Sequence, residues 1–170
     1  EPLDLAFLAK LKKVCEDAQK AYVDFEPAQA LMESEKFFWS HFTDSYLELV
    51  KTRTWGEKTA TEEARVKASA VHTTRLALQT FLKLFAPVLP YTTEEVWGYF
   101  NEGSVHHASY PSGSDFDGIP AGNPLILDAA MAAQAVISGH KTNAKVSIAR
   151  PIVMLKMKVN PETAELFKKA

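Results

Sequence analysis

The sequence contains a single cysteine and no long hydrophobic run. Cys15 cannot form an internal disulfide, and it stands in an amphipathic helical pattern, which predicts a buried, reduced thiol of the kind found in cytosolic proteins. No apolar stretch approaches the roughly 20 residues that a transmembrane helix needs. The first residues, EPLDLAFLAKL, lack the basic region and the cleavage site of a signal peptide. We therefore expect a cytoplasmic protein that does not bind a membrane.

Signatures of catalysis and of metal binding are missing as well. The sequence has no glycine-rich phosphate loop, no G-x-S-x-G elbow and no H-E-x-x-H motif. Its five histidines, at positions 41, 72, 106, 107 and 140, do not have metal-ligand spacing with each other or with Cys15. The adjacent carboxylates Glu94 and Glu95 suit the positive first turn of a helix. We expect no catalytic residue, no metal site and no cofactor site in this chain.

The composition is that of an ordinary globular domain, with 46% hydrophobic and 24% charged residues. The 170 residues suffice for one core and a small additional unit. The net charge of −2 conceals a strong asymmetry along the chain. Residues 51–83 hold seven Lys or Arg against three Asp or Glu, and residues 140–160 hold five against none. Two basic segments in an otherwise acidic chain favour a local contact with a polyanion over general DNA binding.

The stretch FFWSHFTDSYLELVK, which begins at Phe37, carries the widest apolar stripe of the chain. Its inward positions, at helical spacing, are Phe38, Phe42, Ser45 and Leu49. Phe37 falls off this stripe, and we expect it to face solvent or a partner. A stripe of this width is typical of a helix that packs between two neighbours. We interpret the stretch as the central helix of a helical bundle.

The same periodicity predicts further helices on both sides of this stretch. The predicted helices cover about residues 3–22, 27–51, 62–86, 92–100 and 124–139, and the third has Val71, Leu78, Leu82 and Phe85 as its inward stripe. The predicted boundary residues are Pro27, Pro87, Pro90, Thr92 or Thr93, Asn123 and Gly139. Residues 54–62 are polar and predict a mobile loop, and residues 101–123 predict a long surface excursion rich in Gly, Pro and Ser.

The C-terminal residues predict a different structure. After a basic connector the segment IVMLKMKV alternates, with Val153, Leu155, Met157 and Val159 on one face, as in a half-buried strand, and Asn160 opens a final helix. A single strand is not stable alone, so we expect a longer protein that supplies its neighbour. The predicted organisation is a helical bundle over 1–100, the excursion over 101–123, and an incomplete α/β unit over 124–170.

Topology brings the basic residues together. In an up-down bundle the start of the first helix, the end of the second and the start of the third share one end. That end gathers Phe7, Lys10, Lys51, Arg53, Trp55, Lys58, Arg65, Lys67, His72 and Arg75. Unstacked RNA bases and their phosphates bind such a mixture of aromatic and cationic side chains. The competing interpretation is a solvated basic rim without a ligand.

Five motifs occur together along the chain: EPLDLAFLAKL, FFWSHFTDSYLELVKTR, LKLFAPVLPYTTEEVW, GSVHHASYP and KTNAKVSIAR. In this combination the chain resembles the anticodon-binding domain of bacterial valyl-tRNA synthetases, which are class I aminoacyl-tRNA synthetases. The second and third motifs also resemble isoleucyl and leucyl relatives, whereas the last two are more specifically valyl.

The resemblance implies a mainly α fold: an up-down helical bundle of the class I synthetase anticodon-binding type, with a small, truncated C-terminal α/β extension. It implies that this domain binds the anticodon stem-loop of tRNA(Val) and positions it for aminoacylation with valine. The ligase chemistry would belong to a catalytic domain of the parent protein, which uses ATP and Mg and lies outside this sequence. The chain itself is then expected to be non-catalytic, free of cofactors and monomeric.

The resemblance also nominates site residues. In the family, anticodon bases are read near the starts of the first and third bundle helices, which here correspond to Leu5, Ala6, Phe7, His72, Thr73, Arg75, Leu76 and Ala77. Combined with the basic end, the predicted RNA-binding residues are Phe7, Lys10, Lys51, Arg53, Lys67, His72, Thr73, Arg75 and Leu76. Lys51, Arg53 and Arg75 are expected to hold phosphates.

Two alternatives stay open. The chain could be the anticodon-binding domain of an isoleucyl- or leucyl-tRNA synthetase, which the valyl-like motifs disfavour. It could also be a helical scaffold whose basic end binds an acidic protein. Charge reversal of Lys51 and Arg53 would abolish RNA binding and would leave a purely apolar interface unaffected.

Overall fold

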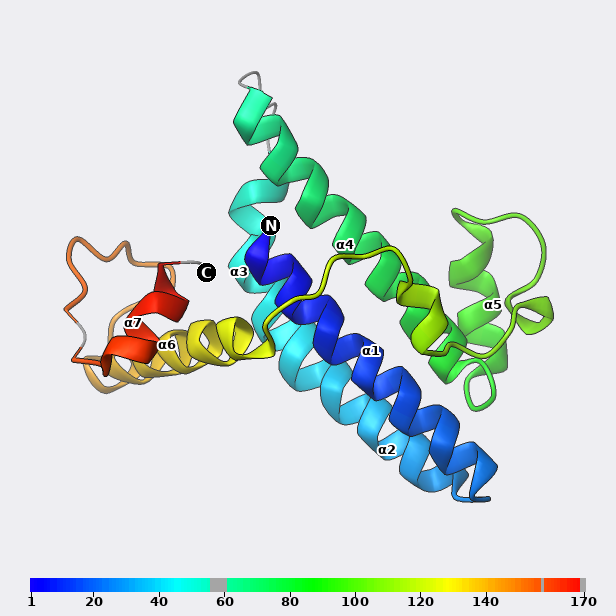
Figure 1. Cartoon of the computed structure of the whole chain (residues 1–170). Helices are drawn as coiled ribbons and strands as arrows, with labels where there is room; N and C mark the ends of the chain where they lie inside the picture. The colour runs from blue at the N-terminus through cyan, green and yellow to red at the C-terminus, as the bar shows by residue number, and fades with distance from the viewer. Residues whose placement is uncertain (56–60, 157, 169–170) are drawn as a thin grey trace.

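A computed structural model describes residues 1–55, 61–156 and 158–168, and every regular element within these ranges is helical (Figure 1). The elements are α1 (Pro2–Val23), α2 (Pro27–Phe37), η1 (Phe38–Tyr46), α3 (Leu47–Thr54), α4 (Thr61–Phe85), α5 (Pro90–Gly98), η2 (Val105–His107), η3 (Gly113–Phe116), α6 (Pro124–Asn143) and α7 (Pro161–Phe167). The prediction of a mainly helical bundle is confirmed. None of the described helices combines the length and the apolar character that a membrane crossing requires.

The first two long helical segments form an antiparallel pair. After α1, Phe25 adopts a left-handed conformation (φ 60°) that reverses the chain, and Pro27 begins α2, as predicted. The pair continues through η1 and α3, so that α2, η1 and α3 together follow one path beside α1 (Figure 1). Cys15 lies on the inner face of α1 and is buried, in agreement with its helical pattern.

The middle of the central helix is π-helical, which corrects the predicted stripe. Ser45 Oγ donates to the carbonyl oxygen of Ser40, five residues earlier, at 2.8 Å. Phe37 and Phe42 are likewise five residues apart, and both are buried, although Phe37 was expected to face out. A wider turn advances the chain by one extra residue per turn, so it carries Phe37 onto the same face as Phe42. The core follows Phe37, Phe42, Tyr46 and Val50.

The inward face of α4 also differs from the predicted one. Its buried residues are Ala70, Thr73, Ala77, Thr80, Phe81, Leu82 and Leu84, whereas Val71 is 46% exposed. Alanine and threonine at the inward positions allow α4 to lie close to α1, with which it is in contact. The larger side chains of Val71 and Leu78 are thereby displaced toward α3, where they line a groove.

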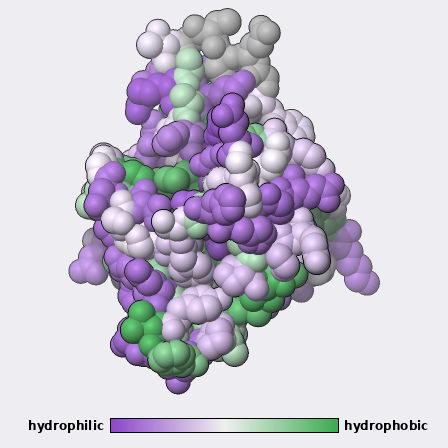
Figure 2. Space-filling model, turned by 90° about the vertical axis from the view of Figure 1, so that its right-hand side faces the viewer, coloured by the Kyte–Doolittle hydropathy of each residue, from purple (hydrophilic) through white to green (hydrophobic). Residues whose placement is uncertain are grey.

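The helix after α4 begins at a proline. Residues 86–89 interrupt the helical path as predicted, and Pro90 is the first residue of α5. The N-cap predicted at Thr92 or Thr93 is wrong, because both residues lie within α5. Thr93 Oγ1 donates to the carbonyl oxygen of Leu89 at 2.8 Å. Figure 2 shows the face that carries α5: it is largely hydrophilic, and hydrophobic atoms reach the surface in separate areas.

The segment between α5 and α6 crosses back over α4 and α1 (Figure 1). Val105 and Phe116 anchor it in the core. Near its end, a β-carbon at Gly122 would lie 2.0 Å from the carbonyl oxygen of Leu5, so only glycine fits there without displacement. This contact covers the start of α1.

Side-chain caps begin the last two helices. Asn123 Oδ1 accepts a hydrogen bond from the backbone N–H of Leu125 at 3.1 Å, and Asn160 Oδ1 accepts one from Thr163 at 2.7 Å, both as predicted. The predicted end at Gly139 is wrong, since α6 continues to Asn143. The left-handed residue after this helix is Lys145 (φ 52°).

The predicted strand does not form in the described residues 152–156 and 158–159. Val153 is fully exposed, and no second strand lies within the described ranges to accept its ladder hydrogen bonds. Met157, which was assigned to the same face, lies outside the described residues.

Candidate nucleic-acid interface

A buried carboxylate joins the helix ends that the sequence places together. Asp4, on the first turn of α1, is 1% exposed. Its oxygens accept hydrogen bonds from Arg53 Nη2 at 2.6 Å, from Tyr46 OH at 2.8 Å and from Ser69 Oγ at 2.6 Å. The start of α1, the end of α3 and the first half of α4 therefore share one end of the bundle, as the up-down topology predicts.

The hydrogen bonds to Asp4 give Arg53 a structural role. A carboxylate removed from water needs a counter-charge and donors for its lone pairs, and Arg53, Tyr46 and Ser69 supply them. Burial, followed by the negative charge of Asp4, raises the pKa of Tyr46 far above its usual value, so the phenol stays a donor. The Arg53 side chain is 19% exposed and points its guanidinium at Asp4. The predicted phosphate contact of Arg53 is therefore replaced by a structural role.

Two other predicted RNA-binding residues, Phe7 and Thr73, are buried in the bundle. Phe7 has no exposed surface, and its ring stacks on Tyr46 with centroids 4.2 Å apart. Thr73 is also buried, against the core. A buried ring offers no face to a base, so we remove Phe7 and Thr73 from the site. The neighbouring positions Ala6 and Ala77 are buried as well.

The remaining predicted residues divide into two groups. Lys10 lies on the α6 side of α1, where its Nζ pairs with Asp128 at 2.9 Å, and Lys67 and Leu76 are half-buried on α4. Lys51, His72 and Arg75 are exposed. Lys58 lies outside the described residues. The structure thus brings Lys51 and Arg75 to one surface and leaves Lys10 on another.

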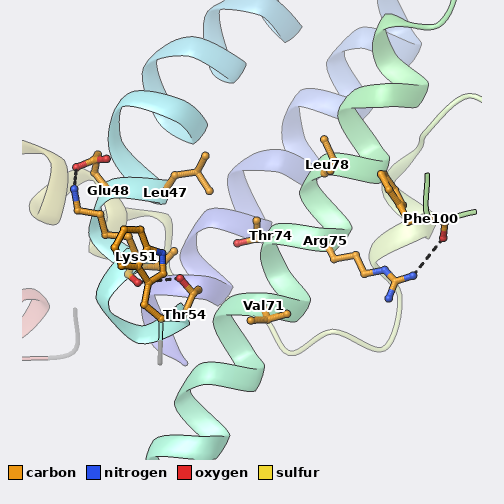
Figure 3. A pocket seen from close by; sticks show the side chains of 11 residues that line it. Leu47, Glu48, Lys51, Thr54, Val71, Thr74, Arg75, Leu78 and Phe100 are labelled. Carbon is orange, nitrogen blue, oxygen red and sulfur yellow. Dashed lines mark hydrogen bonds and ion pairs between the residues drawn. The ribbon is translucent and has the colours of Figure 1, made fainter. Parts of the chain in front are cut away.

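That surface is hollowed between α3 and α4, and we call it the α3–α4 groove (Figure 3). It encloses about 660 Å³, within the roughly 300–1,000 Å³ that small-molecule sites occupy. Its lining residues are Leu47, Glu48, Val50, Lys51, Thr54, Trp55, Val71, Thr74, Arg75, Leu78 and Phe100. Leucine, valine and aromatic side chains make most of the wall, and the charged residues stand at its sides.

Two cations flank the groove from opposite helices (Figure 3). Lys51, on α3, pairs with Glu48, and Arg75, on α4, donates to the carbonyl oxygen of Phe100 at 3.5 Å. Both side chains are exposed, and exposed pairs of this kind contribute little to stability, so a phosphate can replace the present partners. Trp55 is 75% exposed at the end of α3, with a ring available for stacking.

Sequence reasoning missed most of the groove lining. Val71 and Leu78 were assigned to the core, and Thr74 and Phe100 were not considered as site residues. A signal for the α4 residues exists, because Val71, Thr74 and Leu78 recur at spacings of three and four on α4. The neighbouring positions Ala70, Thr73 and Ala77 have the same spacing. Periodicity alone therefore leaves two candidate inward faces.

An apolar groove flanked by cations, with an exposed indole at its end, suits unstacked RNA bases and their phosphates. The chain belongs to the anticodon-binding domain family of tRNA ligases, whose family model matches residues 4–156. The resemblance inferred from the motifs is thereby confirmed.

Curated relatives agree with the family model. The chain is 42% identical over 153 residues to the valine–tRNA ligase of Leifsonia xyli, 40% over 149 residues to that of Thermobifida fusca, and 38% over 173 residues to that of Bifidobacterium longum. These matches cover 89%, 87% and 97% of this chain, but 17%, 16% and 19% of the relatives. The chain thus spans less than a fifth of the length of these relatives, and their names support the valyl interpretation over the isoleucyl and leucyl ones.

Proposed function

We propose that this domain binds the anticodon stem-loop of valine tRNA and positions the tRNA for a catalytic domain of the same parent protein. The parent would be a cytoplasmic, monomeric ligase that joins valine to tRNA with ATP and Mg. The names of the relatives and the family match over residues 4–156 support this assignment.

The observation that carries the proposal is the position of Lys51 and Arg75 on opposite sides of the α3–α4 groove. Phosphates of a looped RNA strand would bind these two cations. His72, which is exposed on α4, follows the groove residue Val71 in the sequence. Unstacked bases would rest on the apolar wall and on Trp55. This arrangement performs no chemistry. It fixes the orientation of the RNA, while Arg53 holds α3 against α1 from inside the bundle.

The test is binding of the full chain to the valine-tRNA anticodon stem-loop at two salt concentrations. A matched stem-loop with the middle and third anticodon bases changed serves as control. We expect binding that weakens at higher salt and that is weaker for the changed loop. Equal affinity for both loops would reduce the surface to a phosphate-binding site, and no binding at low salt would contradict the proposal.

A further inference from the structure

The hydroxyl group of Thr74 has no hydrogen-bond partner among the described residues, and its oxygen is buried. Three other threonines on the described helices donate to the carbonyl oxygen four residues earlier. Thr43 does so to Trp39, Thr80 to Leu76 and Thr93 to Leu89, each at 2.8 Å. Thr74 departs from this pattern although it lies in the same long helix as Thr80.

Thr74 lines the α3–α4 groove between Val71 and Leu78 (Figure 3). Its side chain extends from α4 toward α3, where Leu47 forms the opposite wall. The other lining threonine, Thr54, donates to the carbonyl oxygen of Lys51 at 2.9 Å. Thr74 is therefore an unsatisfied hydroxyl in an otherwise apolar wall, and such a group lowers the stability of the free domain.

We infer that the α3–α4 groove receives one unstacked RNA base, whose edge forms a hydrogen bond with Thr74 Oγ1. The inference rests on the proposed function and names the position within that site where a base is read. No hydrogen bond holds Oγ1 in its present rotamer. A turn about χ1 toward the groove therefore breaks no hydrogen bond and leaves the hydroxyl free to donate or accept.

An RNA base fits the lining better than an apolar protein segment does. An apolar side chain would leave Thr74 unpaired and would remove Arg75 from water with only the carbonyl oxygen of Phe100 as its partner. A nucleotide supplies all three complements: a polar edge for Thr74, an aromatic face for the walls and for Trp55, and a phosphate for the cations.

The test combines one protein substitution with one RNA substitution. Thr74→Val keeps the shape of the side chain and removes only the hydroxyl, and Thr43→Val is the matched control, because Thr43 lies on η1 outside the groove. On the RNA side, an abasic nucleotide replaces each loop position of the valine-tRNA anticodon stem-loop in turn. Affinities are measured for all combinations, and thermal midpoints are measured for the three proteins.

We expect Thr74→Val to weaken binding of the intact loop about 3- to 10-fold, the value of one hydrogen bond. At one abasic position the substitution should have no further effect, since the base that Thr74 contacts is already missing. The thermal midpoint of Thr74→Val should be unchanged or higher, because the variant loses an unsatisfied group. Thr43→Val should not change the affinity.

Three results would overturn the inference. Equal affinity of the wild type and Thr74→Val for the intact loop would exclude the hydrogen bond. An effect of Thr74→Val that persists at every abasic position would show that the hydroxyl does not contact a base. Failure of the wild type to bind the intact loop at low salt would remove the proposed function and this inference together, whereas the first two results leave the proposed function standing.

Discussion

Nη2 of Arg53 lies 2.6 Å from Oδ1 of Asp4, and this ion pair joins the last turn of α3 to the first turn of α1. The two residues are 49 positions apart in the sequence. The pair converts a cation of the predicted RNA surface into a structural element. It also leaves Lys51 and Arg75 as the exposed cations that line the α3–α4 groove.

Asp4→Ala should destabilise the bundle by about 3 kcal/mol, because it leaves Arg53, Tyr46 and Ser69 without their shared acceptor. Urea unfolding followed by circular dichroism measures the change. Asp17→Ala, which removes an exposed pair with Lys13, is the control and should cost less than about 1 kcal/mol. Equal losses for the two variants would contradict the central role of Asp4.

Lys51→Gln and Arg75→Gln should each weaken binding of the anticodon stem-loop and reduce its salt dependence. One lost phosphate contact lowers the slope of log affinity against log salt by about 0.7–0.9. Lys20→Gln, an exposed substitution in the last turn of α1, is the control and should change neither quantity. Arg53→Gln should act differently from both groove variants, by lowering the midpoint of unfolding. A salt slope that is unchanged in Lys51→Gln and Arg75→Gln would argue against phosphate contacts at the groove.

The stability of the domain should depend on the protonation of His41. Burial, followed by the positive charge of Lys10, lowers the pKa of His41 from its ordinary value of 6.5. Below pH 6.5 the unfolded chain therefore binds more protons at this position than the folded chain, and the free energy of unfolding decreases as the pH falls toward the folded pKa. His41→Gln should show a shallower decrease than the wild type between about pH 7.5 and pH 5.5. Chemical unfolding at a series of pH values gives both slopes, and identical slopes would contradict the assignment.

Two glycines should respond in opposite directions to alanine. Gly122→Ala places a β-carbon 2.0 Å from the carbonyl oxygen of Leu5, so it should cost about 1–3 kcal/mol by displacing the segment that covers α1. Gly139→Ala meets no atom within 4 Å and lies inside α6, so it should stabilise the protein by about 0.5–1 kcal/mol. Thermal unfolding compares both variants with the wild type. A stable Gly122→Ala protein would mean that the crossing segment can shift away from Leu5.

Local signals predicted most of the helix boundaries. The first helix was expected over 3–22 and spans Pro2–Val23, and the third was expected over 62–86 and spans Thr61–Phe85. The caps at Asn123 and Asn160 were also correct. Each of these signals depends on residues within one or two turns of each other, and such interactions are the same in a short stretch of chain as in the folded protein.

The candidate site was only partly predictable. The sequence indicated the end of the bundle and the residues Lys51 and Arg75, because up-down topology and charge can be read without coordinates. It did not indicate that Phe7 is buried, since a ring at the start of a helix has the same pattern whether it packs inward or faces a ligand. Thr74 was missed because only the tertiary structure shows that its hydroxyl lacks a partner.

The sequence by itself determined the helical class, the order of the main helices and the family, since periodicity, caps and motifs are local properties. Tertiary packing decided which face of α4 turns inward, where the π-helical segment brings Phe37 into the core, and which cation Asp4 neutralises. Two neighbouring sets of positions on α4 have the same helical spacing, one with Ala77 and the other with Leu78. Which set faces inward depends on how closely a neighbouring helix can approach. The partner of a buried charge likewise depends on residues far apart in the chain, which only the folded structure brings together.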